Sequence, residues 1–88
     1  VWVTLNKRRW KLRFVPYLGP NKRGDCDPPE TKGKEIRICS GQTPEREMDT
    51  IIHECLHAQG WHIDEAFIER ASTEIARVLT RAGFEKGE

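Results

Sequence analysis

One segment, residues 43–60, constrains the fold of this chain most, because it predicts an amphipathic helix with recognisable ends. Thr43 suits the N-cap position, Pro44 suits the first helical position, and Gly60 is a typical stop. Its apolar residues recur at helical spacing and predict the buried side of the helix: Met48, Ile51, Ile52, Cys55 and Leu56. Other elements must cover that side, and a chain of 88 residues has room for one small domain.

The residues before this helix alternate between apolar and polar, which is typical of half-buried strands. Residues 1–15 predict a β-hairpin and residues 34–40 a third strand. Residues 16–33 are rich in Gly, Pro, Asn and Asp, and they predict a long loop. The strand residues expected to face the core are Trp10, Leu12, Phe14, Ile36 and Ile38.

A second helix is predicted over residues 64–83, with Asp64 as its N-cap, Gly83 at its end and Phe84 folded back as a cap contact. Its apolar stripe consists of Ile68, Ala71, Ile75, Val78, Leu79 and Ala82. We therefore expect one α+β domain, residues 1–88, in which a small three-stranded sheet packs on the two helices.

The charges of the chain are unevenly distributed. The net charge is +1, but residues 1–24 contain many basic side chains and no acidic one. This stretch predicts either solvated strand faces or a nucleic-acid-binding surface that also uses Trp2 and Trp10. The odd number of cysteines, with no secretory signal and no long apolar run, favours a reducing, cytoplasmic compartment without membrane contact. We also expect the chain to be a monomer.

The first helix carries the sequence His53-Glu54-x-x-His57. Histidines at positions i and i+4 lie one turn apart on the same face of a helix, where both can bind one zinc ion. Glu54 flanks such an ion without binding it, and from there it can take a proton from a zinc-bound water. The motif therefore predicts one zinc ion per chain with Glu54 as general base.

A catalytic zinc ion normally has a third protein ligand and an open position. Glu65 is our first expectation, because a carboxylate from a second helix forms a recognised catalytic set with two histidines. His62 is the main alternative, and Cys26 or Cys39 could supply a thiolate instead. Glu69, one turn after Glu65, could accept the outer hydrogen of a ligating histidine. Tyr17 and His62 are the side chains that could steady an oxyanion.

The stretches "HECLH" and "DEAFIE" resemble the gluzincin metallopeptidases. That resemblance implies His53, His57 and Glu65 as zinc ligands, Glu54 as the general base, and Glu69 as the acid that supports a histidine. The connection between the two helices is shorter than in large gluzincins. The metzincin pattern, with a third histidine after a glycine, is missed by one residue in "HAQGWH", which keeps His62 as a rival.

The stretches "GDCDPP", "KEIRI", "IIHECLHA" and "DEAFIERAS" together also look like short metallopeptidase-like proteins encoded in phage and prophage genomes. That likeness covers residues 1–84, and the outline of the whole chain looks like the minigluzincins. This resemblance implies a zinc peptidase that acts on peptides or proteins inside a bacterial or phage-infected cell. We expect an extended substrate to pair with a free edge of the strand Glu35 to Cys39. The alternatives are a nucleic-acid-binding module with a structural zinc ion, and a latent form blocked by the loop around Cys26 or Asp27.

Overall fold

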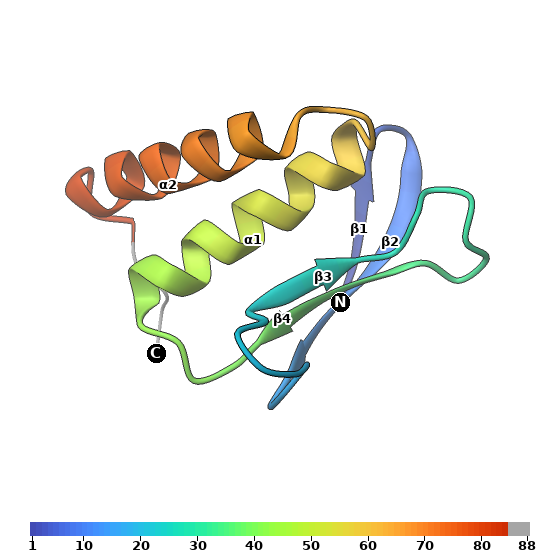
Figure 1. The fold of residues 1–88 in the computed structure, drawn as a ribbon, viewed down its shortest axis with the longest axis horizontal. Coiled ribbons are helices and arrows are strands. Elements are labelled where there is room, and N and C mark those ends of the chain that lie inside the picture. Colours follow the sequence, from blue (N-terminus) through green and yellow to red (C-terminus); the bar gives the residue numbers. More distant parts are fainter. Residues whose placement is uncertain (85–88) are drawn as a thin grey trace.

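The computed structural model describes residues 1–84 of the chain. Its elements follow in the order β1 (Trp2–Leu5), β2 (Arg8–Val15), β3 (Gly24–Cys26), β4 (Glu35–Cys39), α1 (Pro44–Gln59) and α2 (Glu65–Arg81). The strands form one sheet in the order β1-β2-β4-β3, and both helices lie over the same face of it (Figure 1). The predicted α+β fold is confirmed. Neither helix is long and apolar enough to cross a membrane within this range.

The sheet has four strands where the sequence predicted three. The additional strand, β3, lies inside the predicted loop of residues 16–33 and pairs antiparallel with β4. Its sequence, Gly-Asp-Cys, is short and contains residue types that strands usually avoid, so no alternation revealed it. Backbone bonds fix it at both ends: the Arg23 carbonyl accepts from the Cys39 N–H at 2.8 Å, and the Asp27 N–H donates to Glu35 at 3.0 Å.

The strand β4 is an internal strand of the sheet. It pairs in parallel with β2, where Leu12 faces Ile36, and antiparallel with β3 on its other side. The expectation that a substrate pairs with a free edge of this strand is therefore wrong. The free edge on this side of the sheet belongs to β3.

The core lies between the sheet and α1. Trp10, Ile36, Ile38 and Ala58 form its buried centre. Trp10 is fully buried and its indole N–H donates to the Leu5 carbonyl at 3.2 Å, so it cannot serve as a nucleic-acid contact. Phe14 was predicted to face the core, but it is 48% exposed near the end of β2.

The molecule has three layers, the sheet, α1 and α2, because within residues 1–84 α2 packs on α1 and on none of the strands. The expectation that the sheet packs on both helices is therefore wrong, because in the part of the chain that the structure describes only α1 packs on the sheet. A single neighbour covers only a narrow stripe of a helix, and the buried residues of α2 are Ile68, Ser72 and Ala76. Ile75 and Val78 were predicted to be buried but are 44% and 64% exposed.

The end of α2 follows the predicted pattern only in its backbone. Gly83 has a positive φ of 96°, and the Phe84 N–H donates to the Leu79 carbonyl at 2.9 Å. The Phe84 side chain is 64% exposed. The predicted apolar cap contact of Phe84 is therefore wrong.

Candidate metal centre

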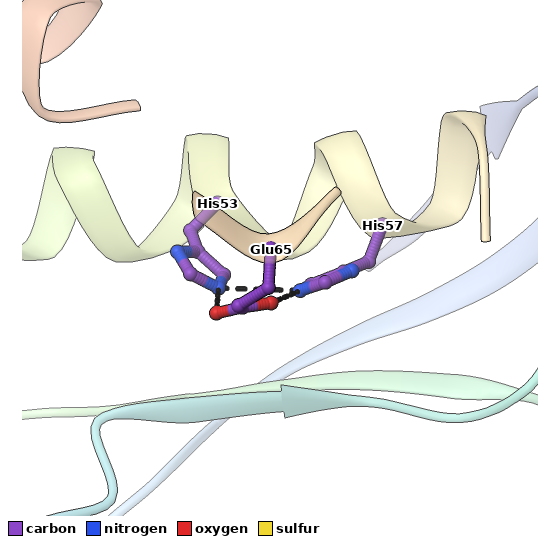
Figure 2. Close-up of side chains that lie close together, drawn as sticks. All are labelled: His53, His57 and Glu65. Atoms are coloured by element: carbon purple, nitrogen blue, oxygen red, sulfur yellow. Dashed lines mark hydrogen bonds and ion pairs between the residues drawn. The ribbon is translucent and has the colours of Figure 1, made fainter. Parts of the chain in front are cut away.

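Three side chains from the two helices converge beside the sheet. His53 and His57 lie one turn apart on α1, and Glu65 is the first residue of α2. Figure 2 shows all three on the side of α1 that faces β3. One ligand atom from each lies within 4.8 Å of the others, so this group could hold a metal ion.

The Glu65 carboxylate bridges the two imidazole rings. Its Oε2 atom lies 3.2 Å from His53 Nε2, and its Oε1 atom lies 2.9 Å from His57 Nε2. The two Nε2 atoms are themselves 3.2 Å apart. The histidine side chains are 20% exposed and that of Glu65 is 57% exposed, so the group is open to solvent on its Glu65 side.

A short turn after α1 brings Glu65 back beside the histidines. The Ile63 N–H donates to the Gly60 carbonyl at 3.0 Å. A Cβ atom at Gly60 would lie 2.6 Å from the Ile63 side chain, so glycine allows this turn to close tightly. The Asp64 side chain accepts from the Phe67 N–H at 3.1 Å and caps α2, as predicted. Helix α2 therefore starts at the residue that joins the group.

Glu54 lies next to the group but points toward the sheet. It is only 7% exposed, and it makes no hydrogen bond through its carboxylate within residues 1–84. Burial raises the pKa of Glu54 to about 7, the negative charges of Asp25 and Glu65 add to this, and Lys22 opposes it. A carboxyl group with a pKa near neutrality can both accept and release a proton at neutral pH.

Two cavities meet at Glu54. One, of about 520 Å³, lies beside His53, His57 and Glu65, which we call the metal group. It is lined by Gly24, Asp25, Cys26, His53, Glu54, His57, Trp61, Ile63 and Glu65. The other, of about 430 Å³, extends toward α2 and is lined by Asn21, Lys22, Arg23, Gly24, Asp49, Thr50, His53, Glu54, Glu69, Ser72 and Thr73. Because Gly24, His53 and Glu54 line both, they form one cleft between α1 and β3.

The strand wall of this cleft depends on Gly24. A Cβ atom there would lie 2.6 Å from Thr50 Cγ2, 3.0 Å from the Arg37 carbonyl oxygen and 3.3 Å from Glu54 Cγ. Only a residue without a side chain lets β3 come this close to α1. Gly24 was not predicted as a site residue, and its place in a long Gly- and Pro-rich loop was the only signal for it.

An ion-pair network holds β3 from its other face. The Arg37 guanidinium bonds Asp25 at 2.7 Å, Asp27 at 2.6 Å and Glu35 at 3.0 Å. Burial alone would raise the pKa of Asp27, but hydrogen bonds from Arg37 and from the Glu35 N–H outweigh it and lower that pKa. The network joins β3, and Asp27 just after it, to β4. It was not predicted from the sequence.

Several predicted site residues lie outside the metal group. His62 and Tyr17 are exposed and line neither cavity. Cys39 is buried, and its thiol donates to the Lys22 carbonyl at 3.2 Å. Cys26 lines the larger cavity, but burial raises the pKa of its thiol to about 12, which disfavours the thiolate that a metal requires.

Glu69 lies in the smaller cavity together with His53. Its carboxylate makes no hydrogen bond to a histidine or to any other side chain described in the structure. Its support of a ligating histidine therefore stays a prediction. On the same wall, the Thr73 hydroxyl donates to Asp49 at 2.8 Å and joins α2 to α1 one turn before His53.

Comparisons with protein-family models, with curated proteins and with solved structures find no match for this chain. Its function therefore has to be inferred from the chemistry of His53, Glu54, His57 and Glu65 and from the cleft beside them.

Proposed function

We propose that this chain is a zinc-dependent peptidase of the gluzincin type, in which His53, His57 and Glu65 hold one zinc ion. The observation that carries the proposal is the spacing of the two Nε2 atoms, 3.2 Å. Two nitrogens at about 2.0–2.1 Å from one tetrahedral zinc ion lie about 3.3–3.4 Å apart. Two neutral imidazoles and one carboxylate also match the ligand set of known catalytic zinc sites.

An open coordination position supports catalysis over a purely structural metal. Within residues 1–84 the group contains three ligands, and no cysteine or further histidine joins it. A structural zinc ion is usually closed by four protein ligands. Here the cavity of about 520 Å³ lies beside the group instead, with room for water and substrate.

When bound, the zinc ion supplies a Lewis acid that polarises the substrate carbonyl and acidifies water. Glu54 takes the proton of the attacking water and passes it to the leaving amine. Its burial and its place in both cavities suit this task, because the carboxylate is aimed at the cleft and has no competing partner among the described residues.

The free edge of β3 is the place where an extended peptide can bind. Arg23 and Asp27 direct their bonding backbone groups toward β4, so alternation leaves those of Gly24 and Cys26 on the outer edge. A peptide paired there would cross the cleft in front of Glu54. Backbone pairing is tolerant of sequence, and the two cavities would receive side chains on either side of the cleaved bond.

The test is cleavage of a mixed peptide library by the zinc-loaded protein, compared with Glu54→Gln and with Glu74→Gln. Glu74 is an exposed acid of α2, so its variant makes the same chemical change away from the cleft. We expect Glu54→Gln to keep its zinc and to lose activity by about 100- to 10,000-fold. The control should keep full activity. No cleavage by the wild-type protein, or equal cleavage by Glu54→Gln, would refute the proposal.

A further inference from the structure

A basic and aromatic surface lies on the β1–β2 hairpin, at the opposite edge of the sheet from β3 and the metal group. We call it the hairpin surface, and it consists of Trp2, Lys7, Arg9 and Lys11, all of which are exposed. Arg8 and Lys34 lie toward the other face, because Arg8 pairs with Leu5 next to the buried Trp10 and the Lys34 ammonium lies 5.6 Å from the centre of the Trp10 ring. The proposed peptidase function makes no use of this surface.

The cations of the hairpin surface are not neutralised. None of them forms an ion pair with an acidic side chain among the described residues. The nearby acids are engaged elsewhere: Glu35 pairs with Arg13 and Arg37, and Asp25 with Lys22 and Arg37. The surface therefore carries an uncompensated positive charge, which favours an anionic partner.

The surface also presents a tryptophan. In the β1–β2 register Trp2 faces Lys11 and Thr4 faces Arg9, whereas Val3 faces the buried Trp10. Trp2 and Arg9 thus lie on the outer face of the sheet, away from the helices. Trp2 is 53% exposed, and the Arg9 guanidinium carbon lies 4.6 Å from the centre of its ring.

Cations around an exposed aromatic ring are the combination that binds single-stranded nucleic acid. Basic side chains follow the phosphates, and unpaired bases stack on aromatic rings and on arginine planes without regard to sequence. In a duplex the bases are already stacked and cannot reach a ring on a flat sheet. An acidic protein would satisfy the charges but would leave the tryptophan without a stacking partner.

We propose that the hairpin surface binds single-stranded nucleic acid, with a base stacked on Trp2 and phosphates held by Lys7, Arg9 and Lys11. This inference is independent of the proposed peptidase function, because the surface shares no residue with the metal group or with the cleft. Either can fail while the other holds.

The test uses the whole zinc-loaded protein and a fluorescein-labelled oligothymidylate of about 12 nucleotides, within the usual site size of such surfaces. Binding is followed by fluorescence anisotropy between 50 and 200 mM salt, where about three phosphate contacts predict a loss of affinity of roughly 20-fold. The charge variant is Lys7→Gln/Arg9→Gln/Lys11→Gln. Its matched control removes three exposed cations elsewhere: Lys32→Gln/Arg77→Gln/Arg81→Gln.

We expect the charge variant to bind weakly and with a flatter salt dependence, and the control to bind like the wild type. Trp2→Ala should lose about 5- to 150-fold in affinity, the range for one stacked base, with an unchanged salt dependence. Zinc content and circular dichroism check that each variant is folded. The proposal is overturned by the absence of binding at 50 mM salt, by tighter binding to a duplex or to polyglutamate, or by equal losses in the charge variant and its control.

Discussion

The two walls of the cleft are built in different ways. The helical wall, α1, carries the candidate site residues His53, Glu54 and His57 on sixteen residues of continuous helix. The strand wall, β3, is three residues long and comes closest to the helix at Gly24, which has no side chain at all. The comparison separates two tasks: in the proposed function the helix would supply the chemistry, and the strand supplies a position that distant residues such as Arg37 maintain.

If the two walls have these separate tasks, the largest losses of zinc affinity come from substitutions of the proposed ligands on the helices. Glu65→Ala should lower zinc affinity by more than about 100-fold, because removing even a group that only supports a ligand costs about 10- to 100-fold. His62→Ala is the matched comparison and should have little effect, because His62 is exposed and lies outside the group. Competition with a zinc indicator measures both affinities. A larger loss of zinc affinity in His62→Ala than in Glu65→Ala would mean that the third ligand is His62, in the turn, and not Glu65 of α2.

Zinc should also stabilise the whole domain. Metal that binds only the folded state at about 100 times its dissociation constant adds about 2.7 kcal/mol to the free energy of unfolding. In a domain of this size that corresponds to a rise in melting temperature of roughly 10–20 °C. Thermal melts with zinc and with a chelator measure it, and His57→Ala should show no difference between the two conditions. A zinc-dependent rise in His57→Ala would place the ion elsewhere.

A substitution in the strand wall should lower the stability of the fold and leave the metal affinity unchanged. Gly24→Ala puts a methyl group 2.6 Å from Thr50 Cγ2, and such overpacking typically costs about 1–3 kcal/mol. Urea unfolding of the zinc-free protein measures the loss. Thr50→Ser removes the clashing methyl group and keeps the hydroxyl, so the double variant should recover part of the stability. If Gly24→Ala is as stable as the wild type, β3 does not approach α1 so closely.

The smallest expected effect is a loss of stability in acid. The pKa of Asp27 is lowered in the folded protein, so this carboxylate adds stability above its ordinary value of 3.8. That stability is lost as the pH falls through the lower, folded value. Melting of the zinc-free protein between pH 6 and pH 2 should show a steeper fall for the wild type than for Asp27→Asn. Parallel curves would mean that the network around Arg37 does not hold β3.

The features that depend on neighbouring residues could be predicted from the sequence. The ends of α1, the cap at Asp64 and the candidate ligands all follow from spacings of a few residues. The features that depend on contacts between residues far apart in the sequence could not be predicted. β3 exists because β4 offers it backbone partners, and its own three residues carry no strand pattern. The exposure of Ile75 and Val78 follows from α2 having a single neighbour, which no periodicity within α2 can reveal.

The parallel pairing of β2 with β4 also governs how the chain can assemble. The β1–β2 hairpin closes through a tight turn at Asn6 and Lys7, so it can form as soon as its own residues exist. Trp10, however, is covered by residues that come much later in the chain, such as Ile36 in β4 and Ala58 in α1. During synthesis the hairpin therefore leaves the ribosome with the Trp10 side chain uncovered, and it stays so until β4 and α1 have emerged.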